Sequence, residues 1–130
     1  MDGAGLAAIP LFAEMPAEKR DQVAGVCSDL DVDAGTTLIV EGDFGYAMFV
    51  VTEGTADALK DGEVIRTLAP GDVFGEIAVL SGGRRTATVV AKTPMRLITV
   101  MNRDVWRLER DVPDVGASLR ATIADCLDRY

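Results

Sequence analysis

The feature that most constrains this chain is the regular spacing of glycine-containing turns between short β-prone runs. Leu30 and Val32 alternate with acidic residues, the period-2 pattern of a half-buried strand. Turn signals then recur at intervals of about 6–12 residues, too close together for helices to fit between them. The five signals are Ala34-Gly35, Glu41-Gly42-Asp43, Glu53-Gly54, Asp61-Gly62 and Pro70-Gly71-Asp72. This spacing predicts a mainly β fold, an antiparallel sandwich or jelly roll.

The predicted strands are short, and most are bounded by these turns. Asp61-Gly62 separates two of them by two residues, which indicates a tight hairpin. The expected strands are Leu30–Val32, Thr37–Val40, Ala47–Thr52, Thr55–Leu59, Val64–Leu68, Thr86–Ala91 and Arg96–Val100.

Helical signals occur only near the two ends of the chain. Pro16 suits a first helical position, and apolar Val23, Val26 and Cys27 follow at helical spacing. Near the C-terminus, Pro113 separates two further helical segments, the second of which has one apolar face. We therefore expect a single domain over 1–130, with a helix at about 16–28, a β-roll at about 29–100 and closing helices at about 103–111 and 113–130.

Composition excludes several classes of function. The chain of 130 residues has a net charge of −8 and no histidine. Nucleic-acid and anionic-membrane binders need clustered basic residues, so neither partner is expected. Without histidine, most zinc and iron sites and the histidine-dependent nucleophile systems are excluded, and no metal site or catalytic residue is predicted.

The cysteine pattern and the N-terminus both favour a soluble cytoplasmic protein. Cys27 and Cys126 lie far apart and form no metal-binding spacing, so two reduced thiols are expected. No apolar stretch approaches the roughly 20 residues of a membrane span, and no signal peptide is visible.

Basic residues are concentrated in one region of this acidic chain. Residues 1–83 hold 4 basic and 15 acidic side chains, whereas residues 84–110 hold 7 and 2. For most of these cations the ordinary interpretation is a solvated face of a strand and a helix.

The segment 74–89, FGEIAVLSGGRRTATV, has a different character. Gly75 allows a ligand to approach the backbone, and the N–H groups of a following helical turn favour an anion. Arg85 adds a planar charged group suited to two phosphate oxygens, and Glu76 could accept hydrogen bonds from a neighbouring sugar hydroxyl. Together they indicate a sugar-phosphate pocket, although a glycine-rich hairpin with a surface arginine is a common alternative.

The same segment resembles the phosphate-binding cassette of the cyclic nucleotide-binding domain family. That family includes regulatory subunits of cAMP-dependent kinase, cyclic nucleotide-regulated channels and bacterial catabolite activators. The resemblance extends over nearly the whole chain, through LFAEMP, GTTLIVEGDFGYAMFVVTEGTADAL and APGDVFGE. It implies an antiparallel jelly roll with an N-terminal helix, a short cassette helix and two C-terminal helices.

The resemblance also implies residue roles. Glu76 would accept from the ribose 2′-hydroxyl and Arg85 would bind the cyclic phosphate, with backbone N–H groups of Ile77, Ala78 and Thr86 beside it. The Thr86 hydroxyl would reach the phosphate or a guanine amino group; alternatively, Thr86 is a strand residue facing solvent. The implied purine neighbours are Ala58, Arg66 and Leu68, with Cys126 and Tyr130 covering the base.

Two positions depart from the family pattern. Arg84 stands where proline is frequent, and we interpret it as a solvated or helper charge rather than a ligand. Cys126 stands where channel relatives place a basic residue, so closure over the base would be weaker or supplied by other residues.

The predicted function is a cyclic nucleotide sensor without catalysis or cofactor. Its ligand is cAMP, the commoner family ligand, or cGMP, and its output passes through the terminal helices to an effector domain or protein. The resemblance implies that the phosphate orders the cassette, that apolar residues around Leu80 reposition and that the Leu119–Tyr130 face folds over the base. The alternatives are a fragment of a catabolite-activator-type transcription regulator and a jelly-roll interaction module that has lost nucleotide binding.

Overall fold

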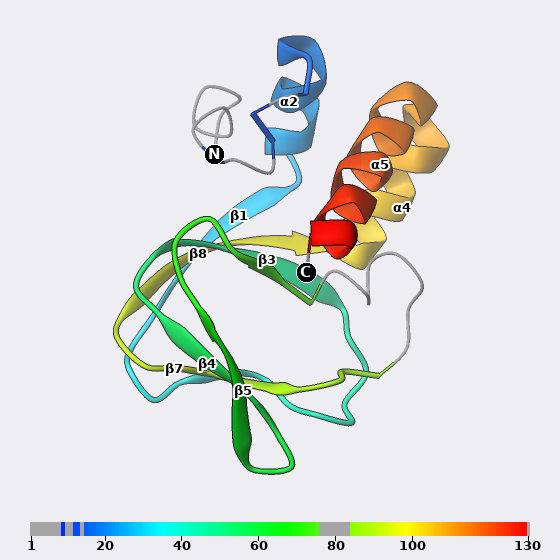
Figure 1. The fold of residues 1–130 in the computed structure, drawn as a ribbon. Helices are drawn as coiled ribbons and strands as arrows, with labels where there is room; N and C mark the ends of the chain where they lie inside the picture. The colour runs from blue at the N-terminus through cyan, green and yellow to red at the C-terminus, as the bar shows by residue number, and fades with distance from the viewer. Residues whose placement is uncertain (1–8, 10–11, 14, 76–83, 130) are drawn as a thin grey trace.

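The computed structural model describes residues 9, 12–13, 15–75 and 84–129, with side chains described as far as residue 124. Helices lie near both ends and strands lie between them (Figure 1). The elements in chain order are α2 (Ala17–Ala24), β1 (Cys27–Val32), β2 (Thr37–Ile39), β3 (Ala47–Glu53), β4 (Ala56–Lys60), β5 (Glu63–Leu68), β6 (Val73–Phe74), β7 (Thr88–Ala91), β8 (Met95–Met101), α4 (Asn102–Asp111) and α5 (Pro113–Arg129).

The strands form two four-stranded sheets in which the paired strands run antiparallel. Sheet A has the order β1-β8-β3-β6 and sheet B has the order β2-β7-β4-β5. Neighbours in each sheet are distant in sequence, as β8 between β1 and β3 illustrates. The predicted jelly-roll architecture is confirmed.

Sheet A lies between sheet B and the helices (Figure 1), so its central strands are covered on both faces. Along β3, Met48 and Val50 pack against the helical layer, whereas Phe49 packs against sheet B. Along β8, Ile98 faces the helices and Leu97 faces sheet B. Burial on both faces explains why β3 has an unbroken apolar run in place of the alternating pattern of a half-exposed strand.

The hairpin between β4 and β5 has the predicted two-residue turn. Lys60 pairs with Glu63, and Asp61 and Gly62 between them have φ values of 53° and 82°. Two successive left-handed residues are the type I′ turn that matches the twist of antiparallel strands. The structure confirms the Asp61-Gly62 hairpin.

The first helix is shorter than the predicted range of 16–28. It ends at Ala24, and the Gly25 N–H donates to the carbonyls of Gln22 and Val23 in a closing turn. Cys27 then begins β1 and pairs with Val100 of β8. The helical spacing of Cys27 was misleading because strand pairing buries this side chain in the same core and satisfies its backbone. The β-roll therefore begins at 27 and not at 29.

Two other strand predictions need correction. The two-residue strand β6 was not predicted, because the pairing of Phe74 with Phe49 depends on a distant strand. Strand β7 begins at Thr88, so Thr86 precedes the strand instead of opening it.

The closing helices pack tightly against each other. A Cβ added at Gly116 of α5 would lie 2.3 Å from the Cα of Glu109 in α4, so only glycine fits at this contact. The Glu109 carboxylate also accepts a hydrogen bond of 2.8 Å from the Arg120 guanidinium. The two helices therefore form one antiparallel unit over sheet A.

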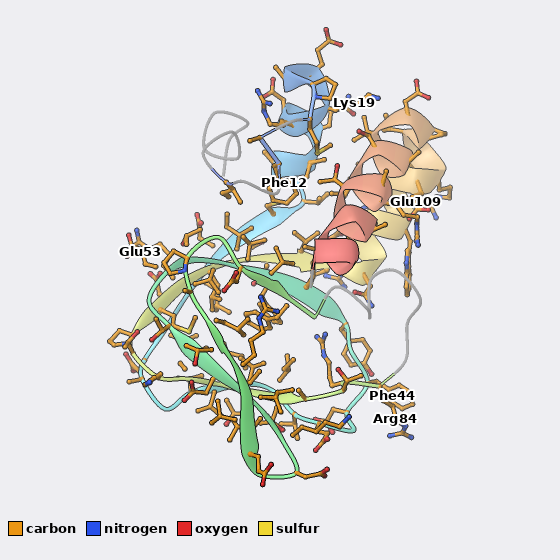
Figure 2. The ribbon with its side chains drawn as sticks, in the orientation of Figure 1. Phe12, Lys19, Phe44, Glu53, Arg84 and Glu109 are labelled. Atoms are coloured by element: carbon orange, nitrogen blue, oxygen red, sulfur yellow. The ribbon has the colours of Figure 1, made fainter. Side chains whose placement is uncertain are left out.

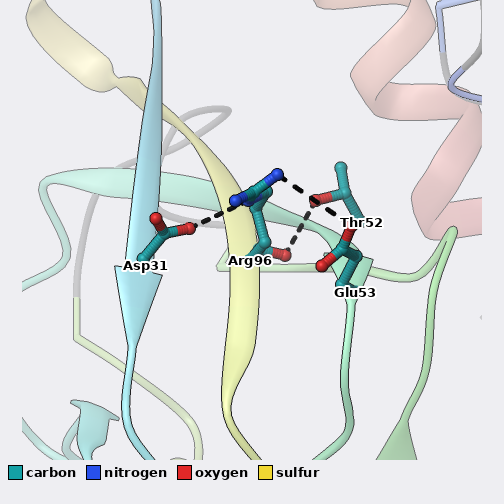
Figure 3. A network of polar contacts seen from close by, with 4 residues as sticks. All are labelled: Asp31, Thr52, Glu53 and Arg96. Carbon is teal, nitrogen blue, oxygen red and sulfur yellow. Dashed lines mark hydrogen bonds and ion pairs between the residues drawn. The ribbon is translucent and has the colours of Figure 1, made fainter.

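Several cations of the basic region pair on the surface, as the interpretation of a solvated face predicts. The Arg96 guanidinium donates to the Asp31 carboxylate at 3.0 Å and lies 4.0 Å from the Glu53 carboxylate (Figure 3). The Thr52 hydroxyl donates to the Arg96 carbonyl at 2.9 Å. Hydrogen bonding to Asp31 raises the pKa of Arg96, so this exposed arginine stays charged.

Cys27 is a free thiol in the core beneath the helices. Burial raises the pKa of this thiol to about 12, so the neutral form persists at physiological pH. A protonated buried thiol is a poor nucleophile and metal ligand, which gives Cys27 a packing role.

Among the described residues, no helix is long and apolar enough to cross a membrane.

Candidate functional site

One pocket, of about 170 Å³, lies where sheet B meets β6 and the segment 84–87. Its wall is mostly aliphatic and aromatic, and its charged members are arginines. Such a lining suits a ligand that combines an apolar ring with an anionic group. The lining residues are Ile39, Ala58, Ile65, Arg66, Leu68, Val73, Phe74, Gly75, Arg84, Arg85, Thr86, Ala87 and Val89.

The Arg85 side chain is fixed at this pocket by two backbone carbonyls. Its Nη1 donates to the Gly75 carbonyl at 3.2 Å, and its Nη2 donates to the Ala47 carbonyl at 2.7 Å. These two bonds fix the direction of the half-buried guanidinium, a planar group that is always charged. The pocket therefore presents an oriented cation.

Gly75 is required by this arrangement. Its φ of +78° is unfavourable for residues with a side chain, and a Cβ there would lie 2.6 Å from the Arg85 Nη1. The glycine predicted to allow a ligand near the backbone thus makes room for the guanidinium itself.

Arg84 is held by the turn that follows β2. Its Nη1 donates to the Gly42 carbonyl at 2.7 Å, and its guanidinium carbon lies 4.5 Å from the centre of the exposed Phe44 ring (Figure 2). Arg84 lines the pocket rim, but its hydrogen bond and ring contact are made outside it. This geometry agrees with a helper charge.

The predicted purine neighbours converge on the same pocket. Ala58 pairs with Arg66 across β4 and β5 and with Val89 across β4 and β7, which aligns the three residues across sheet B. The Arg66 guanidinium lies 3.5 Å from the Asp72 carboxylate, and Asp72 also accepts from the Ala69 N–H at 2.9 Å. The structure therefore brings Ala58, Arg66 and Leu68 together with Gly75, Arg85 and Thr86.

The remaining predicted residues are not described. Glu76, Ile77, Ala78 and Tyr130 lie outside the described residues, and Cys126 lies in α5 beyond the last described side chain. Thr86 is exposed at the pocket rim.

Several apolar residues of the lining were not predicted from the sequence. Ile39 of β2, Val73 and Phe74 of β6 and Val89 of β7 come from three different strands, and strand register alone brings them together. Ile65 carried a weak signal in the sequence, where it follows apolar Val64 directly. In the structure both side chains of this pair in β5 remain more than half exposed. An uncovered apolar side chain beside a pocket suits contact with a ligand.

The described residues suit binding rather than bond chemistry. No group of three metal-ligating side chains occurs within 15–75 or 84–124. The described pocket lining has cations, backbone groups, one hydroxyl and apolar walls, without a carboxylate or thiol. A small ligand with an anion at the Arg85 end fits this set of groups.

Comparison with known proteins identifies the family. The model of the family described as "Cyclic nucleotide-binding domain" matches residues 30–111, well over half of the chain. The chain belongs to the cyclic nucleotide-binding domain family.

The relatives of this chain include kinase regulatory subunits and ion channels. A cAMP-dependent protein kinase regulatory subunit of Yarrowia lipolytica is 36% identical over 82% of this chain and 29% of its own length. A cyclic nucleotide-gated potassium channel of Rhizobium etli is 29% identical over 90% of this chain and 33% of its own length. This domain thus spans about a third of the curated relatives it matches.

A solved structure supports the fold. The regulatory domain of a Toxoplasma gondii cAMP-dependent kinase, crystallised with cAMP, superposes with a TM-score of 0.80 at 20% identity, covering 98% of this chain and 49% of that one. By family, this cyclic nucleotide-binding domain is a regulatory module.

Proposed function

We propose that this domain is a cyclic nucleotide sensor that binds cAMP, or cGMP, in the pocket beside Arg85. The observation that carries the proposal is the Arg85 guanidinium, oriented at an apolar pocket by the carbonyls of Gly75 and Ala47. A cyclic phosphate carries one negative charge on two free oxygens, which matches the two-pronged donor of a single guanidinium. The acidity of the chain as a whole disfavours polyanions and is compatible with this one small anion.

The proposed roles of the cassette residues follow the family pattern. Arg85 binds the cyclic phosphate, Glu76 accepts from the ribose 2′-hydroxyl, and backbone N–H groups of Ile77, Ala78 and Thr86 complete an anion nest. Gly75 supports this assignment because its left-handed backbone keeps the guanidinium in place.

The purine is proposed to lie along sheet B. Ala58 and Leu68 offer apolar contact, and Arg66, whose guanidinium is positioned beside Asp72, offers a planar donor to the ring. Cys126 and Tyr130 of the closing segment are proposed to cover the base.

The proposed mechanism is a shift between two arrangements of the closing helices. The nucleotide stabilises the arrangement in which the end of α5 covers the base, and the movement passes to an attached domain or a partner protein. The kinase regulatory subunit and the channel among the relatives support such coupling, since in both the matching region is about a third of a longer protein. The proposed setting is the cytoplasm, and the proposed role requires no catalysis.

Thermal unfolding tests the proposal. A ligand that binds only the native state at 100 times its Kd adds about 2.7 kcal/mol of stability. We expect cAMP or cGMP to raise the Tm by several degrees, whereas 5′-AMP, with the same base and an open, dianionic phosphate, has little effect. An unchanged Tm with both cyclic nucleotides would contradict the proposal.

Thr86 tests how the base is distinguished. Its exposed position at the pocket rim leaves the hydroxyl available to the phosphate or to the 2-amino group of guanine. We expect Thr86→Ala to weaken binding by about 2- to 12-fold, the effect of one neutral hydrogen bond. Calorimetric titration with both nucleotides measures it: a larger loss for cGMP assigns the hydroxyl to the base, and equal losses assign it to the phosphate. Unchanged affinity for both would leave Thr86 as a solvent-facing residue.

A further inference from the structure

Residues 42–47, which follow β2 and include the first residue of β3, contact both Arg85 at the pocket and the start of α4. On the pocket side, the Arg85 N–H donates to the Asp43 carbonyl at 2.6 Å, and the Gly42 N–H donates to the Arg85 carbonyl at 3.0 Å. The Arg85 side chain also binds the last residue of the segment, Ala47. Main chain and side chain of one arginine thus hold both ends of a six-residue stretch.

The middle of the segment is held by α4. The Asn102 N–H donates to the Tyr46 carbonyl at 2.8 Å, and the Asn102 Nδ2 donates to the Gly45 carbonyl at 3.0 Å. Asn102 is the first residue of α4, and its side chain is only 4% exposed. Among the described residues it is the one buried polar side chain, in a core that is otherwise apolar.

The two sets of contacts lie on adjacent residues. The carbonyls of Gly45 and Tyr46 bind α4, and the carbonyl of Ala47, next in sequence, binds Arg85. Consecutive rigid peptide planes share one Cα atom, so a shift of the plane that holds the Ala47 carbonyl moves the Cα that it shares with the plane of the Tyr46 carbonyl. An anion that draws the guanidinium away from Ala47 would therefore disturb the anchor of α4.

We propose that residues 42–47 transmit phosphate binding from Arg85 to the closing helices, and that Asn102 is the positioning residue that fastens α4 to this segment. The inference rests on the proposed function, because it assigns a route for the ligand signal. Asn102 is not among the residues that line the pocket, and its proposed action passes through its bonds to the backbone of residues 45–46.

The test separates binding from helix movement. Spin labels at exposed Lys60 of β4 and exposed Ala117 of α5, introduced as Lys60→Cys and Ala117→Cys with Cys126→Ser, report the distance between the β-roll and the closing helices. In the wild-type background, saturating cAMP is expected to shift this distance distribution. With Asn102→Ala we expect affinity within about threefold of wild type and a shift reduced by more than half. Arg103→Ala, an exposed neighbour in α4, is the matched control and should retain the full shift.

A full shift in Asn102→Ala would overturn the proposal, because α4 would then move without its anchor. An equal reduction in Arg103→Ala would also overturn it, by showing a general effect of altering α4. Failure of the wild-type background to bind cAMP or cGMP would instead reject the proposed function.

A second measurement uses the unaltered side chain. The Asn102 backbone and side-chain amides give separate NMR signals, and each reports one bond to the segment. Saturating cAMP is expected to change the shift or the exchange rate of both signals in the wild-type protein, even if Asn102→Ala fails to fold. Unchanged Asn102 signals on a protein that binds cAMP would overturn the proposal.

Discussion

Arg85→Ala is expected to weaken cyclic nucleotide binding by about 30-fold to several thousand-fold, the largest effect on affinity of any pocket substitution. The guanidinium is the charged group whose two hydrogen bonds, to the carbonyls of Gly75 and Ala47, hold it at an apolar pocket. Removing one partner of a desolvated charge pair typically costs about 2–5 kcal/mol, which converts to that range of affinity. Calorimetric titration with cAMP measures the loss directly.

Two further variants separate the effect of the Arg85 charge on affinity from the effects of its planar geometry and of its position. Arg84→Ala removes the adjacent cation, whose bond to Gly42 and stacking on Phe44 lie outside the pocket, and should weaken binding by no more than a few-fold. Arg85→Lys keeps the charge but loses the planar pair of donors, so its affinity should fall between those of wild type and Arg85→Ala.

Folding controls complete this comparison, because Arg85 also ties Ala47 and Gly75 together. Each variant should show cooperative urea unfolding and a wild-type far-UV spectrum before its affinity is interpreted. If folded Arg85→Ala binds cAMP as tightly as Arg84→Ala does, the phosphate does not bind at Arg85.

Truncating a buried side chain on either face of β8, Leu97 or Ile98, is expected to produce the largest losses of stability. Leu97 and Ile98 are both fully buried, and each packs in a different layer of the core. Leu→Ala and Ile→Ala substitutions at such sites remove about 2–5 kcal/mol from the free energy of unfolding. Leu97→Ala would open a cavity between the sheets, whereas Ile98→Ala would open one beneath the helices.

Urea denaturation measures both losses. Val64→Ala provides the control, because Val64 lies in β5 outside the pocket and is 56% exposed, and it should change stability by no more than about 0.5 kcal/mol. A loss below about 1 kcal/mol at Leu97 would contradict the description of a core between the sheets, and the same result at Ile98 would contradict the helical layer.

Local sequence patterns predicted most strands because short-range chemistry determines them. The Asp61-Gly62 turn shows this, since its two left-handed residues form the predicted hairpin. Cys27 and β6 show where local patterns fail, because pairing with distant strands determines the structure of both. Cys27 fits a helical pattern and a strand equally well, and pairing with Val100 decides between them. The two residues of β6 become a strand only by pairing with β3.

The candidate site likewise contains residues that local sequence patterns predict and contacts that they do not. Arg85 and Gly75 were predictable because both belong to one local motif whose residue types suit an anion. The carbonyl of Ala47 that holds the guanidinium was not predictable, since the bond joins residues 38 apart in sequence. The anchor of α4 at Asn102 spans 57 residues and involves backbone acceptors, which leave no mark in the sequence.

Calorimetric titration of the wild-type domain with cAMP and cGMP tests directly whether the domain binds a cyclic nucleotide. We expect saturable binding of at least one of them with one site per chain, and no competition by 5′-AMP at equal concentration. Absence of measurable heat and of any Tm shift with either cyclic nucleotide, on a protein shown to be folded, would contradict this expectation.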